Sequence, residues 1–322
     1  MKSARNLVAT LLATAVTTIA SAQGWPNKPV KFVIPFPPGG GTDILARPLA
    51  QKLSEKWGQP VVIDNRGGAG GTIAAKQVAL ADPDGYTILF GLLGVNAIAQ
   101  SLYGNPGFNS TKDFASIVMV ANTTNLLVVH PSVPANSVAE LIALAKREPG
   151  KLNYASPGNG TPSHLATEIF KKMAGVDLTH VPYKGSGPAM TDMLAGNVQV
   201  WIANAPPILP HIKTGKLRSL ASTSAKRPPS ALDVPTLDEA GLKGYEADTW
   251  FGLFAPAKTP KPILDKIYND VVEVLKTKEI QDFYAQQGGE VILMTQEEFT
   301  RRVAADVAKW KALVSDLKLR IE

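Results

Sequence analysis

Short apolar segments alternate with amphipathic segments along most of the chain. The stretch VKFVIPF, which starts at Val30, has the length of a buried strand, and TDILARPLAQKLSEKWG after it has the apolar spacing of a helix. QPVVIDNR, GTIAAKQVALADPDG and YTILFGL continue the pattern as strand, helix and strand. This order predicts an α/β fold whose sheet is mostly parallel and carries helices on both faces.

The second half of the chain repeats the alternation. Strands are expected at LLVVHPSV, LNYASPG, LTHVPYKG and VQVWIAN, with helices between them, and at LRSLAST and DTWFGLFAPA. Two long helices are expected to complete the chain. In the last of them, over residues 295–317, apolar residues recur at helical spacing, which predicts one face packed in the core.

The first 22 residues have the pattern of an export signal. Lys2 and Arg5 precede the apolar run LVATLLATAVTTIA, and the ASA that ends at Ala22 has the form of a cleavage site. The run is short for a membrane anchor, and no stop-transfer charges follow it. We therefore expect export, cleavage after Ala22 and a periplasmic protein.

Composition excludes several kinds of function. The chain has no cysteine, which rules out disulfides, thiolate catalysis, and zinc–thiolate or iron–sulfur sites. Removal of the signal takes away two of the 33 basic residues and none of the 27 acidic ones, leaving a net charge of +4. The basic residues are scattered, so nucleic-acid binding is not expected, while a mildly positive surface suits small anions.

Three glycine-rich loops are the strongest candidates for chemistry. PFPPGGGTD, NRGGAGGT and ASPGNGTPSHL each lie between a predicted strand and the start of a predicted helix. In α/β folds ligands bind at this end of the strands. The first turn of a helix has unpaired N–H groups and partial positive charge, and glycine lets a ligand approach the backbone. Such loops suit a phosphate, a sulfate or a carboxylate.

Nucleotide and enzyme motifs are missing from these loops. No G-x-x-x-x-G-K-[ST] or G-x-S-x-G string occurs, and GGAGGT has Ile73 where G-x-G-x-x-G requires its last glycine. The four histidines do not have a metal-binding spacing. No cofactor and no metal are therefore expected. His164 is a candidate for the ligand site because it lies in a first helical turn beside one of the loops, whereas a structural role is expected for Asp43.

The loops belong to a larger set of motifs. The set comprises WPNKPVKFVIPFPPGGGTDILARPLAQKL, VVIDNRGGAGGTIAA, DPDGYTILFG, GKLNYASPGNGTPSHLATEIF, THVPYKGSGPAMTDMLAGNVQV, LPHIKTGKLRSLA, DVPTLDEAG and WFGLFAPAKTP. With these segments the chain resembles, over nearly all of its mature length, the extracytoplasmic solute-binding proteins of tripartite tricarboxylate transporters, the Bug (TctC-like) family.

The resemblance implies a two-domain, type II-like periplasmic-binding fold that closes on its ligand like a flytrap, with a mostly parallel sheet flanked by helices in each domain. Residues 23–124 and 224–322 are expected to form domain I and residues 125–223 domain II, with the ligand cleft between them. The implied partners are a small organic carboxylate, either a di- or tricarboxylate or an aromatic one, and the membrane subunits of such a transporter. The protein is expected to be a monomer and not an enzyme.

The resemblance also assigns the ligand site. It places one carboxylate between two loops, residues 36–42 and 156–163, where backbone amides and hydroxyls hold it, and it adds further residues to the cleft wall. The residues expected to bind the ligand are Phe36, Pro37, Gly39, Gly40, Gly41, Thr42, Gly67, Gly68, Asn96, Ser156, Gly158, Gly160, Thr161, Ser163, His164, Tyr183, Gly185, Ala203 and Asn204.

Two departures from the family pattern bear on the ligand. Many relatives have Asp where this chain has Ala203, and small hydroxyl residues where it has Leu92, Leu93 and Gly94. An acidic side chain could pair with an amino group, so its loss argues against an amino-acid ligand and for a less polar pocket. Simple repacking of the wall is the alternative.

Two other functions stay open at this point. A ligand sensor that contacts a signalling partner would use the same cleft. An exported hydrolase would need Ser163 and His164 as a reactive pair, but neighbouring helical residues point about 100° apart, which disfavours a hydrogen-bonded nucleophile and base.

Overall fold

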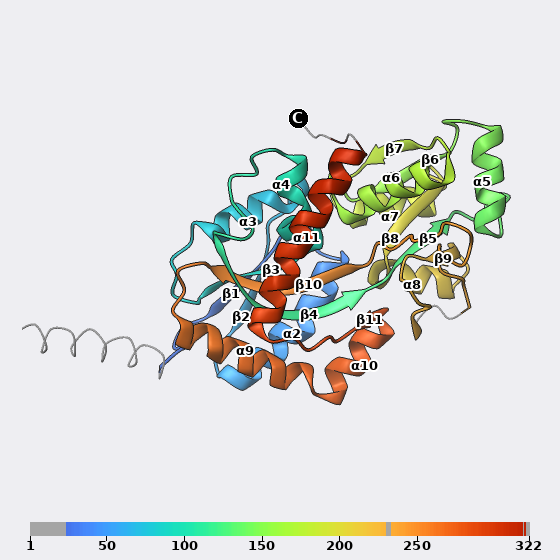
Figure 1. The fold of residues 1–322 in the computed structure, drawn as a ribbon. Coiled ribbons are helices and arrows are strands. Elements are labelled where there is room, and N and C mark those ends of the chain that lie inside the picture. Colours follow the sequence, from blue (N-terminus) through green and yellow to red (C-terminus); the bar gives the residue numbers. More distant parts are fainter. Residues whose placement is uncertain (1–23, 230–232, 318, 320–322) are drawn as a thin grey trace, which may run out of the picture.

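Two β-sheets, each flanked by helices, make up the protein (Figure 1). The computed structural model describes residues 24–229, 233–317 and 319, so the predicted export signal and its cleavage site lie outside the described residues. Within these residues no helix combines the length and apolar character needed to cross a bilayer. The predicted α/β class is confirmed.

The first sheet contains six of the described strands. In spatial order they are β11 (Gly289–Glu290), β4 (Phe114–Thr123), β10 (Thr249–Pro256), β3 (Thr87–Leu92), β1 (Val30–Ile34) and β2 (Val61–Asn65). β2 and β3 pair parallel to β1, whereas β10 is antiparallel to both β3 and β4. β1 to β4 therefore all run in one direction.

The second sheet follows the same plan. Its described strands are, in spatial order, β7 (Thr179–Pro182), β6 (Asn153–Ser156), β8 (Val200–Asn204), β5 (Asn125–Val129) and β9 (Arg218–Ser222). β6 is parallel to β7 and β8, and β5 is antiparallel to β8 and β9. The chain enters the second sheet through β5 and returns to the first sheet through β10. These two strands run opposite to the other long strands of their sheets, which share one direction.

Helices cover both sheets. Those around the first sheet are α2 (Gly41–Trp57), η1 (Ala69–Gly71), α3 (Thr72–Ala79), the π-helix η2 (Gly94–Ile98), α4 (Ala99–Leu102), α9 (Lys261–Leu275), α10 (Lys278–Gln286) and α11 (Gln296–Asp316). Those around the second sheet are α5 (Val138–Arg147), α6 (Pro162–Ala174), α7 (Ser186–Leu194) and α8 (Ala205–Lys213).

Alternation along β8 shows how the second sheet is buried. Val200 and Ile202 face a core shared with α5 and α6, and Trp201 and Ala203 face a separate core shared with α7 and α8. All four side chains are almost completely buried. Successive residues of a strand point to opposite faces, so a strand covered on both sides is apolar throughout.

Two chain crossings lie side by side between the sheets. β4 passes into β5 through Thr124, and the chain returns from β9 to β10 over residues 223–248. The backbone N–H of Asn125 donates to Thr223 Oγ1 (3.1 Å), and the Asn125 side chain donates to the carbonyl oxygen of Ala247. These bonds join the two crossings into one buried strip.

Some elements differ from the sequence-based expectation. β4, η2, α4 and α8 were not predicted. The two long helices expected at the end of the chain are α9 and α11, but a shorter helix, α10, lies between them and was not predicted. Thr277 has an extended backbone (φ −65°, ψ 139°), which ends one helix and begins the next.

The last helix connects distant parts of the structure. α11 packs against β4, η2 and α4, and its end reaches α6 of the second sheet (Figure 1). There the Lys172 ammonium lies 2.5 Å from the Asp316 carboxylate. Near its middle, Asp306 accepts a hydrogen bond from the indole nitrogen of Trp250 (2.8 Å), and Arg302 donates to the same carboxylate. Trp250 is 1% exposed, so Asp306 is the partner that its indole N–H requires.

We expect the Asp306→Ala substitution to lower the free energy of unfolding by about 1–3 kcal/mol, because it leaves a buried donor unpaired. Urea denaturation measures this loss. Glu297→Ala is the matched control on the same helix, since among the described residues Glu297 pairs with Arg301 at an exposed position. It should change stability by less than about 0.5 kcal/mol. Equal effects of the two substitutions would contradict the assignment.

Candidate functional site

A narrow cavity of about 50 Å³ lies between the two sheets. Both glycine-rich loops that were predicted to hold a carboxylate contribute to it. The lining residues are Phe36, Gly40, Gly41, Thr42, Leu92, Asn125, Pro157, Thr161, Pro162, Ser163, Ser186, Trp201, Asn204, Thr249 and Phe251.

Four helices begin at this cavity. Gly40 and Gly41 start α2, Thr161 caps α6, Ser186 is the first residue of α7, and Asn204 precedes α8. Each helix places partial positive charge at its start. Among the described residues that line the cavity, none is Lys, Arg, Asp or Glu. The site therefore offers neutral donors and dipoles to an anion, with no titratable side chain in its wall.

The start of α2 supplies free amide groups. Gly40 caps the helix without a side-chain hydrogen bond, and the first amide to reach a helical carbonyl is that of Ile44, which donates to Gly40 (3.0 Å). The amides of Gly41 and Thr42 come before it, in the turn where helix geometry provides no acceptor. An anion at this position would accept from both.

Asp43 braces this loop from the buried side. Its carboxylate accepts from the Gly39 amide (3.0 Å), from the side chain of Asn65 (3.1 Å) and from the guanidinium of Arg47 (2.9 and 2.8 Å). Burial alone would raise the pKa of Asp43, but these hydrogen bonds outweigh burial and lower it. Asp43 is therefore an ionised support for the loop, as its expected structural role requires.

Two stacked histidines lie beneath the second loop. The rings of His164 and His180 are parallel within 5°, with centroids 4.2 Å apart, and Tyr154 continues the stack on His180. The Gly160 amide donates to His164 Nδ1 (3.1 Å), and Ser156 Oγ lies 2.7 Å from His180 Nε2. The stack therefore holds the loop from below.

Burial keeps both imidazoles neutral. It lowers the pKa of His164, and burial together with the neighbouring His164 lowers the pKa of His180 to about 4. Glu168 and Lys171, which bind each other (2.9 Å), are the charged groups near the pair. Because His164 Nδ1 accepts the Gly160 N–H, that nitrogen must carry no proton.

Ser163 is fully engaged by the protein. Its hydroxyl donates to the Ile202 carbonyl (2.5 Å) and accepts from the indole nitrogen of Trp201 (2.9 Å). It therefore has no hydrogen left to give a carboxylate. His164 Nδ1 is occupied by Gly160, so Ser163 and His164 do not form the reactive pair that a hydrolase would need.

Contacts around the cavity cross from one sheet to the other. Tyr103 donates to the Asn159 carbonyl (2.9 Å). A Cβ atom added to Gly94 would lie 2.6 Å from Pro162 Cδ, and one added to Gly41 would lie 2.3 Å from Asn204 Oδ1. These glycines allow the two sides to approach closely.

Seven of the predicted site residues line the cavity: Phe36, Gly40, Gly41, Thr42, Thr161, Ser163 and Asn204. The other predicted residues are not among those that line it. Pro37 packs against Gly67 and Gly185. Further residues outside the lining are Gly39, Gly68, Asn96, Ser156, Gly158, Gly160, His164, Tyr183 and Ala203.

Two of these outer residues have clear surroundings. Ala203 is fully buried in the core beneath α7 and α8, so the missing acidic side chain is replaced here by packing. Asn96 is also fully buried, and its amide atoms have no partner among the described residues.

Leu92, which was expected to make the pocket less polar, lines it, as do Pro157 and Pro162 of the predicted loop 156–163. The lining residues that were not predicted are Asn125, Ser186, Trp201, Thr249 and Phe251. Ser186 could have been found, because KGSG lies between a predicted strand and a predicted helix. Thr249 and Phe251 could not, since β10 reaches the site only by pairing with strands more than 100 residues earlier.

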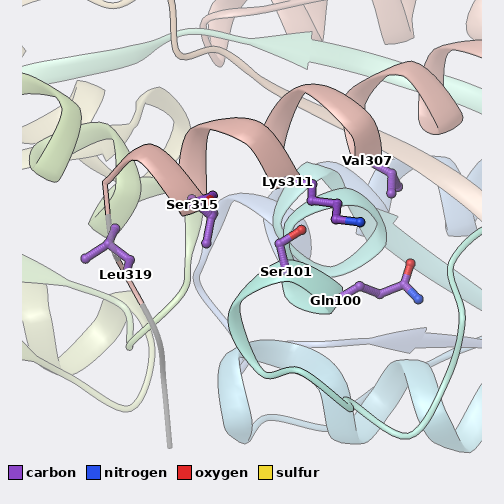
Figure 2. Close-up of a pocket in the computed structure, with 7 residues that line it drawn as sticks. Gln100, Ser101, Val307, Lys311, Ser315 and Leu319 are labelled. Atoms are coloured by element: carbon purple, nitrogen blue, oxygen red, sulfur yellow. The ribbon is translucent and has the colours of Figure 1, made fainter.

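Larger hollows lie elsewhere on the surface. One of about 570 Å³ lies between α11 and α4, and Figure 2 shows Gln100, Ser101 and Lys311 in its lining. Another, of about 730 Å³, lies behind the chain crossings and includes Lys226 and Asp248. Neither is lined by the starts of α2, α6, α7 or α8, so the narrow cavity remains the candidate for an anion.

Comparison with known proteins gives consistent matches. The sequence model of the tripartite tricarboxylate transporter family receptor, TctC, matches residues 45–319. Protein BugT of Bordetella pertussis is 34% identical over 318 residues, which cover 98% of each chain. A solved R. palustris protein with adipate is 39% identical, with a TM-score of 0.90 over 92% of this chain and 100% of that chain. The periplasmic binding protein BugD is 37% identical, with a TM-score of 0.89 over 92% and 100%.

The histidine stack predicts a loss of stability in mild acid. In the unfolded chain imidazoles titrate near 6.5, whereas His180 stays neutral down to about pH 4. Between pH 4 and 6.5 the unfolded state binds more protons than the folded state. The contribution of the stack to the free energy of unfolding is therefore complete above about pH 6.5 and decreases as the pH falls toward 4.

Thermal unfolding between pH 4 and 8 measures this dependence. The Tm of His180→Gln should fall less steeply than that of the wild type. His211→Gln, a change on α8 outside the stack, should keep the wild-type slope. A slope that His180→Gln leaves unchanged would contradict the assignment.

Proposed function

The chain belongs to the tripartite tricarboxylate transporter receptor family, and from this premise we propose that it captures a small organic carboxylate in the cavity between its sheets. Candidates are a di- or tricarboxylate or an aromatic carboxylate. The membrane subunits of a tripartite tricarboxylate-type transporter would receive the bound ligand.

The convergence of four helix starts on a cavity without charged side chains carries this proposal. A carboxylate is an acceptor-only anion, and it matches a site that offers amide donors and dipoles. The R. palustris relative was solved with adipate, a carboxylate. The second loop contributes the amide of Ser163 in the first turn of α6, whereas the Thr161 hydroxyl already donates to the Gly158 carbonyl (2.8 Å).

The energy scale of these contacts is compatible with a transport receptor. A hydrogen bond to a charged group contributes about 1.5–3 kcal/mol, and micromolar affinity requires about −8 kcal/mol. Three or four such bonds offset part of the cost of association and ordering. Contacts to the rest of the ligand then set specificity, because backbone amides recognise any carboxylate.

The two sheets support a division into two domains. We place residues 23–124 and 224–322 in domain I and residues 125–223 in domain II, with the boundaries at the two chain crossings. Rotation about the strip that contains Thr124 and Thr223 would open and close the cavity. The close approaches at Gly41 and Gly94 support the assignment of this structure to the closed form.

The family consists of periplasmic substrate-binding proteins rather than enzymes. For this chain we propose export by the N-terminal signal, cleavage after Ala22, and a monomer that binds without catalysis. The engagement of Ser163 by Ile202 and Trp201 supports binding rather than hydrolysis.

We expect calorimetry against a panel of mono-, di- and tricarboxylates and aromatic acids to find a ligand with a Kd near the micromolar range. Gly41→Ala should weaken that binding at least tenfold, because its Cβ would lie 2.3 Å from Asn204 Oδ1 and hold the cavity open. The control is Gly187→Ala, whose Cβ has no neighbour within 4 Å, and it should bind as the wild type does. A panel without binding would refute the proposed function, and normal binding by Gly41→Ala would refute the site.

Domain closure predicts a change of shape. Small-angle scattering should show a smaller radius of gyration when the ligand found above is added, as the two domains close around it. The Gly41→Ala variant should contract less at saturating ligand. Identical scattering with and without ligand in the wild type would contradict a closure mechanism.

A further inference from the structure

Asn204 is one of the residues that line the cavity, and within the described part of the chain its side-chain oxygen is unpaired. Its Oδ1 is shielded from solvent and has no hydrogen-bond partner among the described residues. A buried polar atom without a hydrogen-bond partner lowers the stability of the folded state. Its position suggests that something outside the protein completes it.

The sequence explains why Asn204 Oδ1 is free. Asn at a helix cap normally accepts from the amides two or three residues further on. Here those residues are Pro206 and Pro207, which have no N–H. Asn204 accordingly precedes α8 without capping it. In the sequence N-A-P-P, the residue at the cap position therefore has no backbone N–H from which its side-chain oxygen could accept.

The orientation of the Asn204 amide is fixed by the chain crossings. The Asn125 side chain donates to the Ala247 carbonyl, which can only accept, so Asn125 Oδ1 faces Asn204. Asn204 Nδ2 donates to that oxygen (3.1 Å), to Thr123 Oγ1 (2.5 Å) and to the Thr124 carbonyl (3.4 Å). The amide nitrogen is therefore committed to the crossings, and the oxygen points away from them.

The free oxygen faces the start of α2. A Cβ atom added to Gly41 would lie 2.3 Å from Asn204 Oδ1, so the acceptor adjoins the amides proposed to hold the ligand carboxylate. An acceptor there repels a bare carboxylate and attracts a ligand atom that carries a hydrogen. With the carboxylate on the Gly41 and Thr42 amides, that atom would lie within one or two bonds of the carboxylate carbon.

We propose that Asn204 Oδ1 accepts a hydrogen bond from a hydroxyl group next to the ligand's carboxylate, so that the ligand is a 2-hydroxycarboxylate. An ammonium group could also donate, but it would face four positive helix starts with no Asp or Glu among the described lining residues to offset its charge. The neutral hydroxyl meets the acceptor without that penalty. This inference rests on the proposed carboxylate-binding function and specifies its ligand class.

The test compares ligands that differ only in the hydroxyl group. Calorimetry or competition binding should show lactate above propionate and malate above succinate, by about tenfold or more for the better enantiomer. The corresponding amino acids, alanine and aspartate, should bind more weakly than the hydroxy acids. In Asn204→Ala the ratio between each hydroxy acid and its deoxy partner should fall to near one.

Two variants control for indirect effects. Ser186→Ala alters the same cavity from α7 and should change both members of a pair alike. Thr123→Val removes one acceptor of Asn204 Nδ2 but leaves Oδ1 in place, so it should keep the hydroxyl preference even if stability falls. Circular dichroism establishes that each variant is folded.

The outcomes distinguish the proposed hydroxyl preference from the more general proposal of carboxylate capture. Wild-type ratios within twofold for every pair would overturn the inference and leave carboxylate capture intact; an ordered water at Asn204 would give this result. A preference that survives in Asn204→Ala would also overturn it. No binding of any carboxylate would overturn the proposed function, and this inference with it.

Discussion

The unpaired amides at the starts of four helices have to be brought to one point, although the helices belong to two different sheets. α2 flanks the first sheet, whereas α6, α7 and α8 flank the second. Parallel strands place successive helix starts at the same sheet edge, so each sheet gathers its own set. The two crossings, joined through Asn125, then set these edges against each other. The buried polar groups of the crossings, such as Asn125 and Thr223, serve this placement.

The supports behind the cavity are as specific as its lining. Asp43 ties Gly39 to Arg47, and the His164 ring receives the Gly160 amide. The two supports accept hydrogen bonds from the Gly39 and Gly160 amides. Only the remaining amides of each loop are then available to a ligand. A glycine-rich loop without them would be too mobile to hold its donors in place, and ordering it would reduce affinity. Loop composition alone therefore does not make an anion site.

Much of this arrangement could be predicted from the sequence. Strands, helices and the loops between them followed from apolar spacing and from runs such as PFPPGGGTD. The resemblance to a known family added Asn204 to the predicted site. The sequence could not show that Ser163 is taken up by Trp201, because that bond joins residues 38 positions apart on different elements. Nor could it place Thr249 in the site, since that depends on β10 returning beside β4.

The absence of titratable side chains from the described wall of the cavity has a consequence for the environment in which the protein works. A receptor that held its ligand with Lys or His would change its own charge, and hence its affinity, as the surrounding acidity varied. Amide dipoles do not titrate, so loading would follow only the ionisation of the ligand itself. The periplasm, where proteins of this family work, takes up the acidity of the medium outside the cell. There, acid would act on the protein through its stability, to which the histidine stack and the supporting carboxylate of Asp43 both contribute, and not through the groups that bind the ligand.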